Sequence, residues 1–207
     1  MKPITHIQFF RSPRDHGHSS STIPFDCTLD DLYNHPHCPA MIKESLEKHV
    51  SWQIRCETDI KRALRAGGRL LAFRAALTVY GYEILPDESG IELNITDAAA
   101  AASYVRPTPA HTPVVAAFAK VSKTNEHIKD IAISLIGIEQ RVITTLDTTS
   151  LSQLPVDVRI LMGPIDEALA AYPGYSDFNG SAEYRLAMAK VSIERALQTC
   201  LEEVNHD

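Results

Sequence analysis

The chain has 207 residues, of which 44% are hydrophobic and 22% are charged, and its formal net charge at pH 7 is −6. This composition is typical of a globular protein, and the length suffices for one hydrophobic core or two small ones. The negative charge disfavours binding to nucleic acid or to an anionic membrane surface. No apolar run approaches the roughly 20 residues of a bilayer-spanning helix, so we expect no membrane association.

The four cysteines are irregularly spaced and form no CxxC pair. Reduced thiols are the default for such a pattern, which indicates a cytoplasmic protein. The first residues, Met1 to His6, lack the hydrophobic region of a secretion signal.

In the first half of the chain, hydrophobic spacing and turn formers predict short strands and helices. Thr28 and Asp31 are spaced as a capping box, and Gly67-Gly68 is expected to end a helix. Asp87 to Gly90 predicts a hairpin turn. The expected elements are a strand over 4–10, a polar loop over 11–22, helical segments over 28–33, 40–50 and 58–66, a helix leading into a strand over 70–85, and a strand over 91–95.

The second half reads as strands followed by helices, with Pro164 expected at the first position of a helix. The expected elements are a tight connector or short helix over 98–102, strands over 114–122, 131–138 and 141–145, and helical segments over 150–154 and 163–171. We therefore predict an α+β fold, a mostly antiparallel sheet with helices packed on one face.

The last thirty residues predict a long helix that faces the core. Asn179-Gly180 is a turn signal, Ser181 is a suitable N-cap, and Glu183 places negative charge near the helix N-terminus. Apolar residues then recur at steps of three and four, which predicts one buried stripe. These residues are Leu186, Ala189, Ile193, Ala196, Leu197, Cys200, Leu201 and Val204.

The segment Gly180-Ser-Ala-Glu-Tyr-Arg185, with Met188-Ala189 and Arg195-Ala-Leu197, resembles the end of the flavoprotein (medium) subunit of molybdenum hydroxylases, the carbon monoxide dehydrogenase and xanthine dehydrogenase family. Further stretches are similar to the central strand of that subunit's C-terminal domain, to its opening hairpin and to the second half of its flavin-binding domain. They are Lys129 to Gly137, Ser103 to Arg106 with Pro113 to Ala117, and Cys38 to Arg55, respectively. The resemblance implies a degenerate flavin-binding portion over 1–97 and a C-terminal-like domain over 98–207.

The same resemblance implies FAD and electron transfer. In the family, a glycine-rich loop near the N-terminus and a second, Thr-x-Gly-Gly-Asn-type loop hold the flavin pyrophosphate, because glycine lets backbone N–H groups approach the phosphates. From the resemblance we expect this chain to begin after the first loop, and Cys56 to Gly68 stands where the second should be. We therefore predict that no cofactor is bound, with FAD binding as the alternative.

Histidine and cysteine are frequent near the N-terminus, which raises the question of a zinc site. The residues are His16, His18, Cys27, His35, His37 and Cys38. Their spacing matches no standard zinc motif, so we predict a polar surface loop and no metal. His16 and His18 remain candidate catalytic residues, because an imidazole on a loop can act as acid or base near neutral pH.

Arg106 to Pro113 contains three prolines, and in the family the equivalent stretch approaches the flavin ring. It predicts either a stiff pocket wall or a rigid hairpin connection. We select His111 as a candidate catalytic residue, and Arg106 and Thr112 as candidate substrate-binding residues.

Tyr82 and Tyr184 are further candidates for substrate binding, with half-buried packing as the alternative. Asp177 and Arg185 are expected to form a structural ion pair that anchors the last helix.

The predicted function is that of a flavin-free, divergent relative of the flavoprotein subunit that acts on a small organic metabolite. It would promote a cyclisation or isomerisation by binding a reactive conformer and polarising a carbonyl group. One alternative is an FAD-binding electron-transfer subunit docked to iron–sulfur and molybdenum subunits. Another is a non-catalytic structural subunit or a homodimer scaffold.

Overall fold

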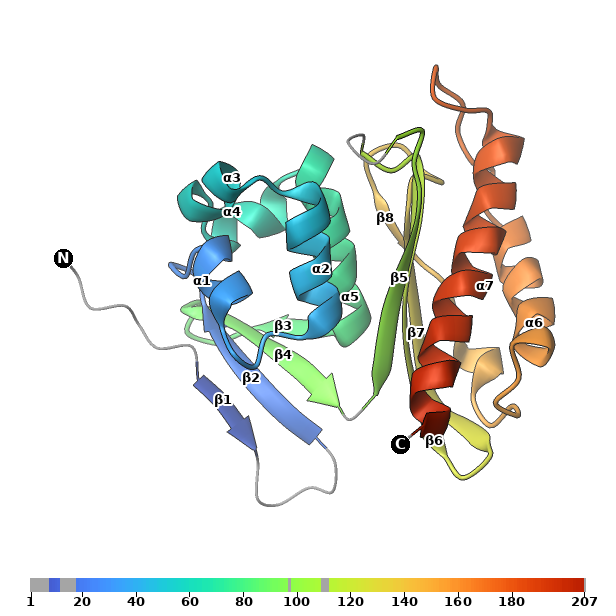
Figure 1. Cartoon of the computed structure of the whole chain (residues 1–207), viewed down its shortest axis with the longest axis horizontal. Helices are drawn as coiled ribbons and strands as arrows, with labels where there is room; N and C mark the ends of the chain where they lie inside the picture. Colours follow the sequence, from blue (N-terminus) through green and yellow to red (C-terminus); the bar gives the residue numbers. More distant parts are fainter. Residues whose placement is uncertain (1–7, 12–17, 97, 109–111, 207) are drawn as a thin grey trace. The chain divides into compact units, whose positions relative to one another are not determined.

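The structure is a computed structural model that describes residues 8–11, 18–96, 98–108 and 112–206. The chain divides into two compact units, Met1–Asp97 and Ala98–Asp207. Each unit contains its own four-stranded antiparallel sheet (Figure 1).

In the N-terminal unit the strand order is β1-β2-β4-β3. The strands are β1 (Gln8–Arg11), β2 (His18–Pro24), β3 (Tyr82–Ile84) and β4 (Gly90–Thr96). The central pair places Ile23 opposite Ile91, and both side chains are fully buried. Gly90 lies opposite Pro24, where an added Cβ would stand 2.3 Å from the carbonyl oxygen of Ile23, so this close backbone approach requires glycine.

The chain between β2 and β3 is helical. The helices are α1 (Leu29–Asn34), α2 (Ala40–His49), α3 (Trp52–Glu57), α4 (Ile60–Arg65), the 3₁₀ turn η1 (Gly68–Leu70) and α5 (Leu71–Tyr80). The predicted capping box is confirmed: the Thr28 side chain accepts from the Asp31 N–H, and the Asp31 carboxylate accepts from the Thr28 N–H. Helices α2 and α5 pack together, and Leu46 and Phe73 are among their fully buried residues.

One prediction for this unit was wrong, and one helix was missed. Residues 18–24 form β2 rather than a loop, because pairing with β4 and β1 overrides the weak strand propensity of the serines. Helix α3 was not anticipated. The predicted helix leading into a strand over 70–85 is confirmed: α5 ends at its C-cap Gly81, whose φ is +74°, and β3 follows directly.

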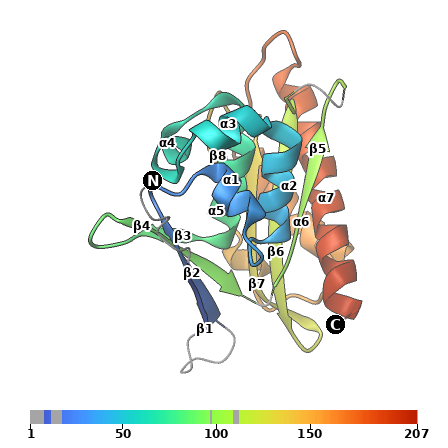
Figure 2. The same ribbon diagram turned by 60° about the vertical axis from the view of Figure 1, so that its left-hand side comes forward.

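The sheet of the C-terminal unit has the order β5-β6-β7-β8. Its strands are β5 (Ala99–Val105), β6 (Val115–Thr124), β7 (His127–Ile136) and β8 (Ile143–Thr145), and the 3₁₀ turn η2 (Thr149–Leu151) follows them. Helices α6 (Val158–Ala170) and α7 (Ala182–His206) lie side by side on one face of this sheet (Figures 1 and 2). Their apolar side chains and those of alternate strand residues form one core.

The predicted C-terminal helix is confirmed, and its buried stripe contains Ala189, Ile193, Leu197 and Cys200. Ser181 caps it, because its Oγ accepts from the Tyr184 N–H at 3.2 Å.

Two other predictions for the C-terminal unit were wrong. The alanine-rich segment is strand β5, which pairs with β6. Ala101 lies opposite Ala119 in this pairing, and small side chains are sufficient where the two strands pack against α7. Pro164 lies inside α6, which instead begins after the N-cap Asp157. The α+β prediction holds for the chain as a whole, and no helix in the described part is both long and apolar enough to cross a bilayer.

Candidate functional site

Arg55 joins two helices of the N-terminal unit. Its Nε lies 3.3 Å from Oδ1 of Asp30, and its guanidinium stacks 4.1 Å from the ring centroid of Tyr33. Both partners belong to α1, so Arg55 holds α3 against α1. The segment that resembles the family's flavin-binding domain therefore has a structural role at this residue.

The next segment, at the position of the expected phosphate loop, is a capped helix. Asp59 is the N-cap of α4, and its carboxylate accepts from the Arg62 N–H at 2.7 Å. The Ile60 N–H donates to the Cys27 carbonyl at 3.0 Å, and the Ala63 N–H donates to the Asp59 carbonyl at 2.9 Å. The Lys61 N–H is directed to the Phe25 carbonyl at 3.5 Å.

Four successive N–H groups at the start of α4 are thus directed at protein acceptors. A phosphate cradle needs such groups to point at the ligand. The Asp59 carboxylate also places negative charge where a pyrophosphate would bring its own. The described residues of this segment do not fit the FAD pyrophosphate.

The sequence suggested that Gly67 and Gly68 cap the C-terminus of α4, but they do not. The C-cap is Ala66, whose N–H donates to the Ala63 carbonyl. Gly68 has a φ of +60° and begins η1. An added Cβ at either glycine would meet no heavy atom within 4 Å.

A second group of polar and aromatic side chains lies in the C-terminal unit, on the sheet face opposite to the helices. Arg106, just after β5, places its Cζ 4.9 Å from the ring centroid of Tyr104. The Tyr104 ring meets the Phe118 ring edge to face, with centroids 5.8 Å apart. Strand register explains this row, because Tyr104 lies opposite Ala116 and Phe118 lies opposite Ala102.

Only one end of this row is accessible. Phe118 is fully buried, whereas Tyr104 and Arg106 are half-buried. A guanidinium on an aromatic ring offers donors to a carbonyl or carboxylate beside an apolar surface. We call Arg106 and Tyr104 the Arg106 platform. Ala102 and Ala116 occupy neighbouring strand positions on the same sheet face.

The other predicted residues of this stretch lie in the connection between β5 and β6. Thr112 is exposed. His111 lies outside the described residues, so its relation to the Arg106 platform stays a prediction.

Lys120 occupies the same sheet face farther along β6, between Ala100 and Ala132 on the adjacent strands. It is only 5% exposed. Burial lowers the pKa of its ammonium group, while the charge of Asp130 acts in the opposite direction.

The histidine-rich region gives no metal site among the residues that the structure describes. Nδ1 of His35 accepts from the His37 N–H at 3.2 Å, and burial, with the nearby His37 and Lys43, lowers the pKa of His35. Cys27 and Cys38 are buried, and burial raises the pKa of each thiol to about 12. His16 lies outside the described residues. His18 begins β2, with only its backbone described.

The two candidate tyrosines belong to different units. Tyr82 is a half-buried residue of β3 in the N-terminal unit. Tyr184, in the first turn of α7, is 43% exposed and packs beside Gly180, where an added Cβ would lie 2.8 Å from its Cδ1.

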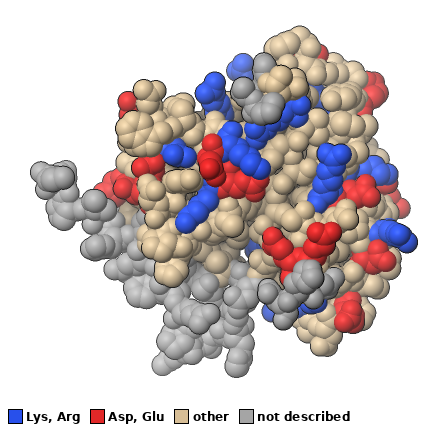
Figure 3. Space-filling model, in the orientation of Figure 1, with Lys and Arg blue, Asp and Glu red and all other residues tan. Residues whose placement is uncertain are grey.

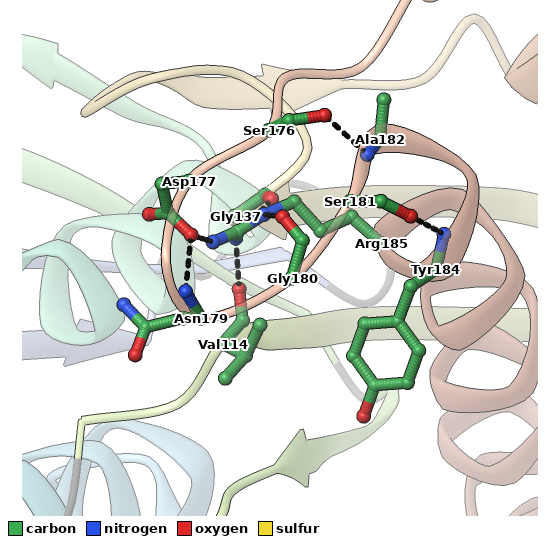
Figure 4. Close-up of polar contacts among 10 residues, drawn as sticks. All are labelled: Val114, Gly137, Ser176, Asp177, Asn179, Gly180, Ser181, Ala182, Tyr184 and Arg185. Atoms are coloured by element: carbon green, nitrogen blue, oxygen red, sulfur yellow. Dashed lines mark hydrogen bonds and ion pairs between the residues drawn. The ribbon is translucent and has the colours of Figure 1, made fainter.

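Arg185 is a buried anchor rather than a binding residue (Figure 4). Its Nη1 donates to the carbonyl oxygens of Val114 at 2.9 Å and Gly137 at 2.8 Å. Its Nη2 forms the predicted ion pair with Asp177 at 2.5 Å. The guanidinium therefore ties α7 to the ends of β6 and β7.

The charged residues on the face drawn in Figure 3 do not indicate a further binding surface. Lysine and arginine side chains alternate there with aspartate and glutamate, so no large patch of one sign is visible on this face. Electrostatic steering of a strongly charged partner therefore has no support on this face.

Sequence reasoning missed Tyr104 and Phe118. The alternation Ala116, Phe118, Lys120 in a strand could have identified one sheet face. The pairing of Tyr104 with that face depends on strand register, which the sequence does not reveal.

No protein-family model and no curated protein sequence matches the chain. Solved structures do match. Against a reconstituted carbon monoxide dehydrogenase from Oligotropha carboxidovorans, the TM-score is 0.75 at 17% identity, over 95% of this chain and 78% of that chain. Against quinoline 2-oxidoreductase from Pseudomonas putida 86, the TM-score is 0.71 at 15% identity, with the same coverages of 95% and 78%.

A third match is carbon monoxide dehydrogenase from Hydrogenophaga pseudoflava in a form that lacks the molybdenum-pyranopterin moiety. Here the TM-score is 0.72 at 15% identity, over 95% of this chain and 78% of that chain. The predicted resemblance to the carbon monoxide dehydrogenase family is confirmed at the level of the fold, across both units of the chain.

Proposed function

We propose that the chain is a flavin-free, divergent relative of the flavoprotein subunit that binds a small organic metabolite. Residues 1–97 correspond in this proposal to a degenerate part of the flavin-binding domain, and residues 98–207 to the C-terminal-like domain. The reaction class is a cyclisation or isomerisation without a cofactor. A cytoplasmic location, in keeping with the four free cysteines, belongs to the same proposal.

The observation that carries the proposal is the capped helix α4. The family's second phosphate loop needs glycines and free N–H groups. Here the Asp59 carboxylate and neighbouring carbonyls accept the N–H groups at 60–63. A fold that keeps its core but has a capped helix in place of the phosphate loop supports a function other than FAD binding.

The Arg106 platform supports a role in binding. Its guanidinium can donate to a carbonyl or enolate oxygen of the ligand, and the Tyr104 ring can pack against an apolar part. A ligand held in its reactive conformation avoids much of the entropic cost of reaction. Arg106 would stabilise negative charge that develops on the oxygen.

Thr112, His111, His16, His18, Tyr82 and Tyr184 remain the further candidates for this proposal. Thr112 follows the Arg106 platform in the same connection and would offer a hydroxyl group. The histidines would move a proton to or from the ligand near neutral pH. The tyrosines would donate hydrogen bonds.

The binding step is tested by a thermal-shift screen of the full-length chain against carbonyl-containing metabolites. A true ligand should raise Tm in a concentration-dependent way, because it binds only the folded state. Arg106→Ala should abolish the shift, and Arg106→Lys should weaken it, since lysine lacks the planar fork. The matched control is Lys129→Ala, a charge removal at an exposed site on β7. If Arg106→Ala and the control showed equal shifts in Tm, Arg106 would not be part of the ligand site.

The second candidate is an FAD-binding electron-transfer subunit, favoured by the likeness to the carbon monoxide dehydrogenase and quinoline 2-oxidoreductase chains. This candidate requires one bound flavin per chain, held without the second phosphate loop. A non-catalytic structural subunit would show neither flavin nor a metabolite-dependent change in Tm.

A further inference from the structure

The connection between α6 and α7 contains an Asn-Gly pair in an exposed turn. Phe178, in the turn 177–180, is 96% exposed, and the next residue, Asn179, is exposed as well. Figure 1 shows this connection projecting beyond the ends of both helices. Solvent therefore reaches the Asn179 side chain, as is usual for a surface loop.

Asparagine followed by glycine can undergo deamidation without an enzyme. The backbone nitrogen of Gly180 gives its proton to solvent base and attacks Cγ of Asn179. A new C–N bond forms, the bond from Cγ to the side-chain nitrogen breaks, and that nitrogen leaves as ammonia with a proton from solvent. Water then opens the cyclic succinimide to aspartate or isoaspartate, so the chain gains one negative charge. Glycine favours the attack because it has no Cβ and the freest backbone.

In the folded chain the attacking group is held in place. The Gly180 N–H donates to the Asp177 carbonyl at 3.2 Å. The Gly180 carbonyl accepts from the Asp177 N–H at 3.1 Å and from Nε of Arg185 at 3.4 Å. The nitrogen has to turn away from the Asp177 carbonyl to reach Cγ of Asn179. Attack therefore requires that this hydrogen bond is broken first.

The residue under attack is held by the same aspartate. The Asn179 N–H donates to Oδ1 of Asp177 at 2.8 Å, and this oxygen also accepts from Nη2 of Arg185 at 2.5 Å. Figure 4 shows the Asn179 side chain directed away from Gly180. The side-chain amide therefore has to rotate before Cγ and the nitrogen reach a reactive arrangement.

These contacts depend on the anchor of α7. Arg185 is 1% exposed and donates to the carbonyls of Val114 and Gly137, which adjoin β6 and β7. It thereby fixes Asp177, and with it the turn, relative to the sheet of the C-terminal unit. Release of the turn requires separation of the Asp177–Arg185 pair. Such local opening costs free energy, and a reaction of the open state is slowed by the small population of that state.

We propose that Asn179 is a deamidation site that the Asp177–Arg185 ion pair keeps closed in the folded chain. Separation of the pair would then lead to an irreversible change, a further carboxylate beside the anchor of α7. The proposal does not depend on flavin, on a metabolite or on the Arg106 platform. Loss of the proposed function would therefore leave it intact.

The experiment is incubation of the full-length protein in mildly alkaline buffer, with and without guanidinium chloride, followed by mass spectrometry of its tryptic peptides. Peptide 160–185 contains Asn179 as its only amide side chain. Peptide 124–129 contains Asn125, an exposed turn residue followed by Glu126, and is the internal control.

In denaturant, Asn179 should deamidate roughly 10-fold or more faster than Asn125, because the Cβ of Glu126 hinders the attack. In native buffer, Asn179 should deamidate at least about 10-fold more slowly than in denaturant. Comparable rates at the two asparagines in denaturant would overturn the site. Equal rates at Asn179 in the folded and unfolded chain would overturn the protection.

Variants test the ion pair itself. Asp177→Ala should raise the native rate at Asn179 roughly 5–10-fold. Arg185→Lys should raise it less, and it decides the question if circular dichroism shows that Asp177→Ala is unfolded. The matched control is Asp147→Ala, which removes a carboxylate that accepts from the Thr149 N–H in another turn and should leave the rate unchanged. An unchanged rate in folded variants of the ion pair would overturn the proposal.

Discussion

Arg185 and Asp177 form an ion pair across the start of α7, with Nη2 and Oδ1 at 2.5 Å. The arginine side chain is only 2% exposed and the aspartate side chain 30%. The Arg185 guanidinium also stacks 4.2 Å from the ring centroid of Tyr175 and donates to the backbone carbonyls of Val114 and Gly137, which adjoin β6 and β7. One buried cation thereby fixes both the last helix and the turn that carries Phe178.

Arg185→Ala should lower the free energy of unfolding by about 3 kcal/mol, because it removes a buried hydrogen-bonded cation and leaves carbonyl acceptors unpaired. Arg185→Lys should recover only part of this, since one ammonium group cannot reach all of the acceptors. Urea denaturation followed by circular dichroism measures both variants. Lys129→Ala is the control and should change the free energy by less than about 0.5 kcal/mol. Equal stability of all three variants would show that Arg185 does not stabilise the fold.

Stability should also depend on pH through Asp177. Burial alone would raise the pKa of this carboxyl group, but hydrogen bonds from Arg185 and Asn179 and the Arg185 charge hold it below its usual value. A lowered folded-state pKa contributes stability above the unfolded pKa, near 3.9, and that contribution is lost as the pH falls through the folded-state value. Asp177→Asn should therefore reduce stability at pH 7 and flatten its decline below about pH 4. A parallel decline in both proteins would contradict the assignment.

Gly137 and Gly163 should respond to alanine very differently. Gly137 has a φ of +93°, and an added Cβ would stand 2.0 Å from the Val114 carbonyl oxygen, the same oxygen that accepts from Arg185. Gly137→Ala should cost about 3 kcal/mol or more, through backbone strain and displacement of β6. Gly163 lies within α6, where an added Cβ would meet no heavy atom within 4 Å apart from its chain neighbours and the helix backbone. Gly163→Ala should change the free energy of unfolding by less than about 0.5 kcal/mol, because crowding of the new Cβ by the ring of Pro164 offsets the gain in helix propensity. Thermal unfolding of both variants measures the difference.

The four thiols should differ in reactivity. Cys56 is exposed, whereas the other three are buried, and burial raises the pKa of Cys27, Cys38 and Cys200 to about 12 each. A chromogenic disulfide reagent at pH 8 should modify about one thiol rapidly in the native chain and all four in urea. Cys56→Ser should remove the rapid phase. Rapid modification of two or more thiols in that variant would show that the core opens readily.

Local signals predicted the elements that depend on local chemistry. Thr28 and Asp31 identified α1, and Ser181 with the apolar stripe identified α7. The polar serines of β2 and the alanines of β5 gave no such signal, because their strand conformation comes from pairing with β4 and β6.

The candidate site depended still more on long-range pairing. The Arg185–Asp177 ion pair could be predicted from the resemblance, but its bonds to Val114 and Gly137 join segments 71 and 48 residues away. The absence of glycines at 56–66 suggested a lost phosphate loop. Only the structure shows that the Ile60 N–H is paired with Cys27 and the Arg62 N–H with Asp59.

The central claim is that the chain does not bind flavin, and the flavin content of the purified full-length protein tests it most directly. The measurement is the visible absorption spectrum, flavin release on denaturation, and calorimetric titration of the protein with added FAD. We predict less than about 0.05 FAD per chain and no binding heat up to about 100 μM FAD, which corresponds to an affinity weaker than about −5.5 kcal/mol. Close to one FAD per chain, or saturable FAD binding at micromolar concentration, would contradict the account and favour the electron-transfer subunit.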